Sequence, residues 1–204
     1  MGTRERLLDA AERIIRERGI MAVTTKDIAR ETGLAEATLY RHFQDKTELL
    51  LAVMSERMPG GFLQLIRDLP QRAGEGSVAG NLERIVAAAV PFFAQTVPLV
   101  AALAADPALS KRYFARLHEL GSGPDPTHGA LAAYLRLEQR LGRVRADASP
   151  AAAATLLLGV CFTYAQVRHQ TGTHPLYPSA EQFVTEIVRT LVSGLAPEES
   201  PGSP

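Results

Sequence analysis

The sequence is poor in cysteine and has no long hydrophobic run, and both absences exclude classes of protein. Cys161 is the single cysteine among 204 residues, so no intramolecular disulfide can form, and a lone thiol fits a reducing compartment. No run approaches the ~20 apolar residues that span a bilayer. The N-terminal segment, Thr3 to Arg18, is amphipathic and charged, unlike a signal peptide. We therefore expect a soluble, cytoplasmic protein without a membrane segment.

An excess of positive charge is also missing. The 22 basic and 22 acidic residues cancel to a net charge of zero, whereas affinity for nucleic acid depends on Lys and Arg that displace counterions from phosphates. The balance persists between residues 24 and 46, where Lys26, Arg30, Arg41 and Lys46 stand against Asp27, Glu31, Glu36 and Asp45. A prediction of DNA binding must therefore rest on the geometry of a motif and not on charge.

Short sequence motifs that place catalytic residues or metal ligands close together are absent as well. His118 and His128 belong to no HExxH pattern, and His169 and His174 lie five positions apart across a glycine, off a common helical face. Cys161 has apolar neighbours in the sequence, which is typical of an inert core thiol. A reactive sensor cysteine would need a basic group nearby. We expect no catalytic residue, no metal ligand and no cofactor. An all-helical enzyme is the alternative, and DNA binding without turnover of a bound metabolite would dismiss it.

What the sequence does contain is the pattern of an all-α protein of about nine helices. Ala and Leu are abundant, β-branched alternation is absent, and no Asn-Gly or Asp-Gly hairpin turn occurs. Three short helices and the start of a fourth precede the helix-breaking segment Met58 to Gly61. The later, more apolar helices are expected at about residues 78–93 with a kink at Pro91, 98–105, 108–120, 127–141, 150–170 and 179–195.

One segment has the signature of a helix-turn-helix. Thr24 with Asp27 resembles a capping box at the start of one helix, and Gly33 ends that helix where the turn needs a left-handed backbone. A short second helix follows, with Leu39 and Phe43 on its inner face because they lie four positions apart. A helix this short does not persist alone, so its outer face is displayed by a scaffold.

A wider set of residues carries a resemblance to a known family. The pattern is Thr24-Thr25-x-x-Ile28-Ala29, Gly33-Leu34, then Thr38-Leu39-Tyr40-x-x-Phe43-x-x-Lys46-x-x-Leu49. It strongly resembles the DNA-binding region of the tetracycline-repressor (TetR) family of bacterial regulators, over about Arg4 to Val53. The resemblance implies a two-fold dimer on a near-palindromic operator, released from DNA by a small-molecule inducer. The chain would then divide into a helix-turn-helix domain at residues 1–48, a helical ligand-binding and dimerisation domain at 49–196, and a disordered tail at 197–204.

Residue by residue, the resemblance implies DNA contacts for Thr25, Lys26, Ala35, Glu36, Ala37, Thr38, Tyr40, Arg41, His42 and Lys46. We expect Arg41 and Thr38 at base edges, and Thr25, Tyr40 and Lys46 at phosphates. Glu36 departs from the family, in which many members carry a basic or neutral polar residue at this position. A carboxylate would repel phosphate there unless it accepts a hydrogen bond from cytosine N4.

The C-terminal domain is where the resemblance places the inducer. Candidate wall residues are Phe92, Phe93, Val97, Tyr113, Phe114, Leu117, Tyr134, Phe162 and Tyr164. The scarcity of charge in these segments favours an apolar or flat aromatic ligand. The alternative is that most of these side chains are ordinary core.

The last two expected helices, at about residues 150–170 and 179–195, have apolar faces. The resemblance makes them the four-helix bundle of a homodimer, although packing within the subunit must account for part of each face. An alternative function stays open, in which a protein of this fold binds DNA and acts through a protein partner without a small-molecule inducer.

Overall fold

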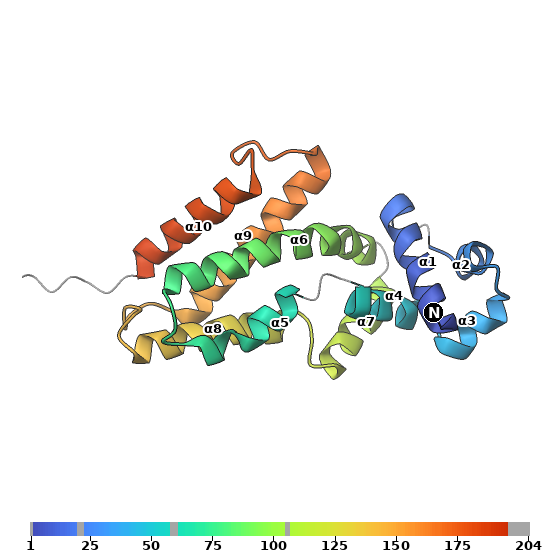
Figure 1. Ribbon diagram of the computed structural model, residues 1–204, viewed down its shortest axis with the longest axis horizontal. Coiled ribbons are helices and arrows are strands. Elements are labelled where there is room, and N and C mark those ends of the chain that lie inside the picture. Colours follow the sequence, from blue (N-terminus) through green and yellow to red (C-terminus); the bar gives the residue numbers. More distant parts are fainter. Residues whose placement is uncertain (1, 20–22, 58–60, 105–106, 196–204) are drawn as a thin grey trace, which may run out of the picture. The chain divides into compact units, whose positions relative to one another are not determined.

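The structure of the protein is a computed structural model that describes residues 2–19, 23–57, 61–104 and 107–195 (Figure 1). Over these residues the chain forms ten α-helices, one short 3-10 turn and no strand. The predicted all-α fold is confirmed. Of the predicted break at Met58 to Gly61, residues 58–60 lie outside the described residues and Gly61 begins the helix Gly61–Asp68. The predicted disordered tail at residues 197–204 also lies outside them.

The described residues fall into two compact units. Unit one is drawn from residues 1–60 and 95–121, and unit two from residues 61–94 and 122–204. Unit one contains α1 (Thr3–Arg18), α2 (Thr25–Thr32), α3 (Glu36–His42), α4 (Lys46–Arg57), the end of α6 and α7 (Pro107–Glu119). Unit two contains α5 (Gly61–Asp68), the 3-10 turn η2 (Leu69–Arg72), most of α6 (Val78–Ala104), α8 (Pro124–Arg140), α9 (Pro150–Thr171) and α10 (Ala180–Leu195).

The helix α6 is longer than the sequence predicts. It runs unbroken from Val78 to Ala104, so the predicted separate helix at residues 98–105 is wrong. Pro91 and Pro98 both lie inside α6, and each costs a helix interior about 3 kcal/mol because its ring removes one hydrogen bond. Apolar side chains buried along the helix offset this cost; they are Leu82, Ile85, Val86, Ala89, Val97, Leu99 and Leu103. Tertiary packing therefore overrides the local helix-breaking tendency.

Unit one packs around two apolar cores that share α4. The first core joins α1 to α2, α3 and α4 and includes Leu7, Ile28, Leu39, Phe43 and Leu49. The second joins α4 to the end of α6 and to α7 and includes Leu50, Leu51, Leu99, Leu103 and Tyr113. Successive residues of a helix point about 100° apart, so Leu49 and Leu50 serve different cores. In this way α4 fixes the helix-turn-helix to α6 and α7.

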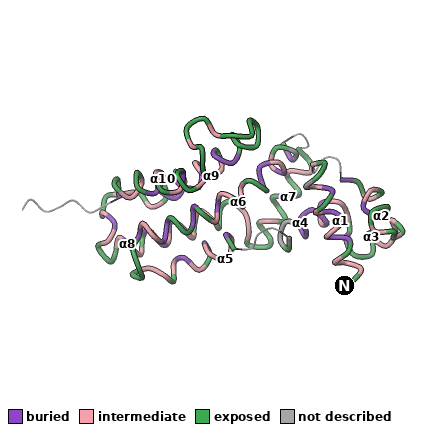
Figure 2. The backbone as a smooth tube through the Cα atoms, turned by 45° about the horizontal axis from the view of Figure 1, so that its top comes forward, coloured by how far each residue is buried: buried purple, intermediate pink, exposed green. Residues whose placement is uncertain are grey.

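Unit two packs five helices around one core. Its fully buried members include Phe62, Leu82, Leu131, Leu157 and Val188, one each from α5, α6, α8, α9 and α10. Buried stretches recur along α8, as expected for a helix with one face in a core (Figure 2).

Two helices are more apolar than the sequence analysis allowed. The segments Val78–Ala101 and Pro150–Thr171 are long and apolar enough to cross a membrane by length and composition alone, so the expectation that no run approaches this length is wrong. Core helices pass the same test, and both segments supply buried residues to unit two. Length and composition therefore do not make either helix a membrane span.

Candidate DNA-binding surface

The first helix of the motif, α2, begins at a capped N-terminus. The Thr24 hydroxyl oxygen accepts a hydrogen bond from the Asp27 N–H at 3.0 Å and donates its proton to Asp27 Oδ2 at 2.6 Å. The hydrogen bond from Thr24 is the main cause that lowers the pKa of the Asp27 carboxyl, and Arg30 adds to it from 2.5 Å. The predicted cap at Thr24 is confirmed.

The turn between α2 and α3 depends on Gly33. Its φ of 67° and ψ of 20° are left-handed, a conformation that strains any residue with a β-carbon. The N–H groups of Gly33 and Leu34 close the end of α2 on the carbonyl oxygens of Arg30 and Ala29, at 3.3 and 3.0 Å. The predicted role of the turn glycine is confirmed.

The helix α3 is held by its inner face. It is only seven residues long, and its N-cap residue, Ala35, has no side-chain hydrogen bond. Leu39 is 0% exposed and Phe43, directly after the helix, is 2% exposed; both lie in the core with Ile28. The predicted inner face is confirmed, and packing rather than capping stabilises the helix.

The other side of α3 is displayed to solvent. Its exposed residues are Ala35, Ala37, Tyr40, Arg41 and His42, while Glu36 and Thr38 are half-buried. Tyr40 is 53% exposed, so much of its ring is open to solvent. A rigid helix with an exposed Tyr and Arg one turn from Ala37 can therefore contact a partner surface.

Glu36 is tied to the preceding helix. The hydroxyl of Thr25, the first residue of α2, donates a hydrogen bond to Glu36 Oε1 at the start of α3. The two residues are eleven positions apart, and their contact depends on how the turn orients the two helices. Sequence patterns gave no signal for this pair.

The start of α4 is fixed by Asp45. Its Oδ1 accepts the Glu48 N–H at 3.0 Å and so caps the helix, and its carboxylate forms an ion pair with Arg112 of α7. Burial opposes ionisation of Asp45, but the Glu48 N–H and the Arg112 guanidinium outweigh it, so its pKa is lowered. Lys46, the first residue of α4, is thereby held in place. Arg112 was missed by sequence analysis because it lies far along the chain.

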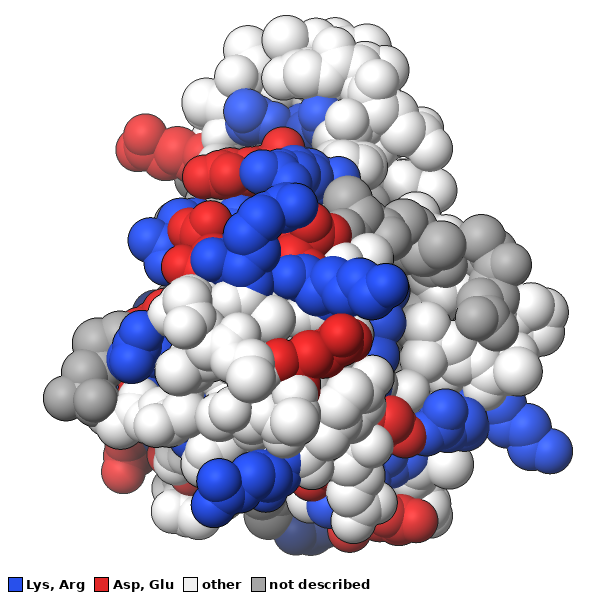
Figure 3. All heavy atoms as spheres, turned by 90° about the vertical axis from the view of Figure 1, so that its right-hand side faces the viewer, with Lys and Arg blue, Asp and Glu red and all other residues white. Residues whose placement is uncertain are grey.

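Basic and acidic side chains are interleaved on the side of the molecule that carries α2 and α3 (Figure 3). Within unit one, ion pairs join Arg4 to Glu56 at 2.6 Å, Arg13 to Glu31 at 3.4 Å and Arg30 to Asp27 at 2.5 Å. Over the described residues, by contrast, no ion pair engages Lys26, Arg41 or Lys46. These three cations are free to meet phosphate or base.

Two family models match the chain. The model for bacterial regulatory proteins of the tetR family covers residues 7–53, and the C-terminal domain of AefR-like transcriptional repressors covers residues 91–193, half of the chain. The chain belongs to the TetR family. The resemblance carried by the helix-turn-helix is confirmed and extends into the C-terminal part. TetR regulators are DNA-binding transcription factors and not enzymes.

Curated TetR-type relatives match the N-terminal part. The uncharacterized regulator YvkB of Bacillus subtilis is 41% identical over 54 residues, 26% of this chain and 29% of that protein. The regulator SrpR of Pseudomonas putida is 33% identical over 84 residues, 41% of this chain and 39% of that protein. The chain thus spans well under two thirds of the length of either relative.

Solved structures share the fold over nearly the whole chain. FadR of Bacillus subtilis, in complex with stearoyl-CoA, superposes with a TM-score of 0.67 at 18% identity, covering 94% of this chain and 98% of that one. A regulator from Saccharomonospora viridis in complex with choline gives 0.67 at 20% identity, covering 93% and 95%. At such identities the likeness shows the TetR fold alone.

The predicted ligand wall of this TetR chain falls into separate groups. Val97, Tyr113, Phe114 and Leu117 belong to unit one; Tyr113 is buried in its second core, and burial raises the pKa of its phenol. In unit two the rings of Phe92, Phe93 and Phe162 are half-buried and form one cluster with Phe62, at centroid distances of 4.8 to 5.8 Å. This phenylalanine cluster (Phe62, Phe92, Phe93, Phe162) is the part of the predicted wall that unit two brings together.

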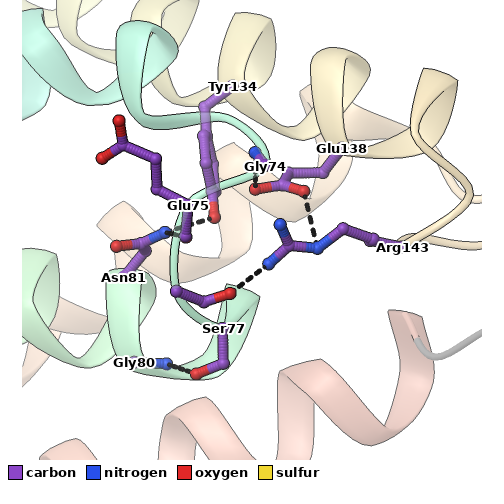
Figure 4. A network of polar contacts seen from close by, with 9 residues as sticks. Gly74, Glu75, Ser77, Gly80, Asn81, Tyr134, Glu138 and Arg143 are labelled. Atoms are coloured by element: carbon purple, nitrogen blue, oxygen red, sulfur yellow. Dashed lines mark hydrogen bonds and ion pairs between the residues drawn. The ribbon is translucent and has the colours of Figure 1, made fainter.

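Two other predicted wall residues serve the core. Tyr134 is 0% exposed, its hydroxyl accepts a hydrogen bond from Asn81 Nδ2 at 3.0 Å, and burial raises its pKa to about 12 (Figure 4). Tyr164 stacks on Phe183 with ring centroids 4.1 Å apart and on His174 at 5.1 Å, which joins α9 to α10. Both positions match the alternative of ordinary core side chains.

A buried ion pair lies beside Tyr134 (Figure 4). Glu138 is 0% exposed; its Oε1 accepts the Gly74 N–H at 3.2 Å, and its Oε2 lies 3.2 Å from Arg143 Nε. Arg143 also donates to the Gly76 carbonyl oxygen at 2.6 Å. These contacts tie the loop before α6 to the end of α8.

The other candidate sites are a buried thiol and a surface hollow. Cys161 is fully buried, and burial raises the pKa of its thiol to about 12, so it stays protonated at neutral pH. A surface hollow of about 400 Å³ involves none of the predicted wall residues; it is lined by Ser179, Glu181, Gln182, Thr185, Glu186 and Arg189. Among the residues that the structure describes, no three His, Cys, Asp or Glu side chains gather as a metal site.

Proposed function

We propose that the protein is a dimeric, cytoplasmic transcriptional repressor that leaves a near-palindromic operator when a small apolar or aromatic ligand binds. The observation that carries the proposal is the displayed side of α3, where Ala37, Tyr40 and Arg41 are exposed while Leu39 and Phe43 are buried. In this proposal residues 1–48 form the DNA-binding domain, and residues 49–196 bind the ligand and the second subunit.

The displayed residues divide into two roles. Arg41 reads a guanine through O6 and N7, and Thr38 contacts a neighbouring base edge. Tyr40 and Lys46 hold phosphates on either side, and Thr25 does so through its backbone N–H at the start of α2, because its hydroxyl proton is donated to Glu36. The remaining positions of the surface, Lys26, Ala35, Ala37 and His42, line the same contact. Exposure of Arg41 and the absence of any ion pair to it within the described residues support the base-reading role.

Alanine variants separate the two roles. Arg41→Ala is expected to weaken operator binding by about 1–3 kcal/mol and to relax the preference at one base pair per half-site.

Lys46→Ala is expected to lower affinity for all sequences and to reduce the salt slope of log affinity by about one. Fluorescence anisotropy with palindromes from the DNA upstream of the gene, between about 50 and about 200 mM salt, measures both effects.

Arg84→Ala is the matched control, because it removes an exposed cation from unit two. It is expected to leave operator affinity unchanged. An equal loss on every DNA for Arg41→Ala contradicts its base-reading role. Failure of the unmodified protein to bind any palindrome contradicts the proposed function itself.

The dimer is proposed to form through α9 and α10. Leu156 of α9 is 65% exposed, and the small residues Ala152, Gly159 and Thr163 are exposed on the same face at helical spacing. An exposed leucine among small residues lets another helix approach closely and cover apolar surface. A second copy fits this surface, because a two-fold operator is read by a two-fold dimer.

A charge placed on this face tests the dimer. Leu156→Glu is expected to shift the protein from dimer to monomer in sedimentation velocity and to weaken operator binding by tenfold or more (~1.4 kcal/mol). Leu176→Glu is the control, because Leu176 is 73% exposed but lies in the loop after α9. A Leu156→Glu protein that remains dimeric excludes this interface.

The phenylalanine cluster supports an apolar or aromatic inducer. The rings of Phe92, Phe93 and Phe162 are half-buried and pack against the buried Phe62, which suits a ligand that buries apolar surface. Phe93→Ala is a direct probe: candidate ligands that release DNA from the unmodified protein are expected to lose potency against it. If no small molecule alters DNA binding but a protein partner does, the alternative of partner-mediated regulation replaces the inducer.

A further inference from the structure

We propose that Glu36, held in position by Thr25, is a specificity-determining residue that selects cytosine in the operator. The inference rests on the proposed function, because it requires α3 to lie in the major groove. It assigns a base preference to the one residue of the surface whose charge is unfavourable for phosphate.

The carboxylate is fixed at the leading end of α3. Glu36 is the first residue of that helix, and the N-terminal residues of the second helix of a helix-turn-helix contact base edges. Thr25 Oγ1 donates to Glu36 Oε1, and over the described residues Oε2 accepts no hydrogen bond. Half-burial of Glu36 limits its rotamers, so Oε2 is a positioned acceptor.

The charge of Glu36 needs a donor from outside the protein. Among the described residues no Lys or Arg forms an ion pair with it, although neighbouring carboxylates such as Asp27 and Asp45 are paired. Bringing DNA against this surface removes water from the carboxylate, which is unfavourable unless a donor replaces that water. Thr25 satisfies one oxygen only, so a donor on a base edge is required for the other.

In the major groove, only cytosine offers a hydrogen-bond donor that has no acceptor beside it. In the major groove guanine offers acceptors at N7 and O6, and thymine offers an acceptor at O4 and a methyl group, so a carboxylate rejects both. Adenine offers a donor at N6 but places the N7 acceptor beside it, which repels the second oxygen of a carboxylate. Cytosine offers the N4 amino group without a neighbouring acceptor.

Glutamine at position 36 provides the sharpest test. Glu36→Gln keeps the length of the side chain and an oxygen that accepts from Thr25, but its amide pairs with adenine N6 and N7. Selection of binding sites from randomised DNA with the full chain is expected to return cytosine at one position per half-site, and adenine there for Glu36→Gln. The change of preference is expected to be about tenfold or more.

Three further variants isolate the cause. Glu31→Gln removes an exposed carboxylate of α2 and the same unit of charge, and it is expected to leave the cytosine preference intact. Thr25→Val removes the hydroxyl and is expected to reduce the cytosine preference several-fold, whereas Thr25→Ser is expected to retain it.

The outcomes are distinct for the inference and for the proposed function. If the unmodified protein selects no palindrome, the proposed function fails. If it selects a palindrome but Glu36→Gln returns the same bases, Glu36 only stabilises the first turn of α3 through the helix dipole, and the inference is overturned. An unchanged preference in Thr25→Val overturns the positioning role of Thr25.

Discussion

Replacing Phe43 with alanine is expected to destabilise the helix-turn-helix by about 3–5 kcal/mol and to abolish binding to every DNA sequence. Phe43 is 2% exposed in the core that joins α1 to α3, and the Arg4 guanidinium lies 5.4 Å from its ring centroid. The substitution would remove the side chain that holds the C-terminal end of α3 and would leave a cavity in its place. Urea unfolding followed by circular dichroism, together with DNA titrations, measures both losses.

Tyr40→Ala is the matched control for this prediction. Tyr40 lies three positions earlier and is 53% exposed, so its removal is expected to change the free energy of unfolding by no more than about 0.5 kcal/mol. Its operator affinity is nevertheless expected to fall, because the proposed phosphate contact is lost. Equal destabilisation by the two variants would contradict the division of α3 into a buried and a displayed face.

Replacing Arg143 with methionine is expected to lower the stability of unit two by about 3–5 kcal/mol, because it leaves the buried Glu138 carboxylate without its cation. Glu138 is 0% exposed and its Oε2 lies 3.2 Å from Arg143 Nε. The hydrogen bond from Arg143 to Gly76, at 2.6 Å, is lost as well. Urea unfolding at neutral pH measures the change.

The double variant Glu138→Gln with Arg143→Met is the control for this pair. A neutral amide costs less to bury than an unpaired carboxylate, and its oxygen still accepts the Gly74 N–H. The double variant is therefore expected to be more stable than Arg143→Met alone. A double variant that is less stable than the single one would show that the uncompensated charge is not the cause of the loss.

The helix-turn-helix was predicted closely because its determinants act over short stretches of chain. Thr24 caps α2 through a residue three positions away, and Gly33 fixes the turn by its own φ. Leu39 and Phe43 face inward because they lie four positions apart on one helix. The same local rules failed for α6, where they predicted two helices separated near Pro98 and packing produced one.

The predicted ligand wall has the weakest sequence signal, because aromatic residues are common in cores as well as in pockets. The sequence alone does not distinguish Tyr134, which binds Asn81 in the core, from the half-buried Phe93. Arg112 and Arg143 carried no sequence signal, since each acts on a carboxylate that the chain brings close only after folding.

By itself the sequence determined that the chain is helical, that a short helix ending near Phe43 is displayed, and that its family is the TetR family. These properties follow from spacing and backbone preference within a few turns of chain. Only the tertiary structure decided which polar residues have partners. It joined Thr25 to Glu36 and Asp45 to Arg112 while leaving Arg41 unpaired within the described residues, because hydrogen bonds and ion pairs require atoms a few ångströms apart, and such distances are fixed by packing.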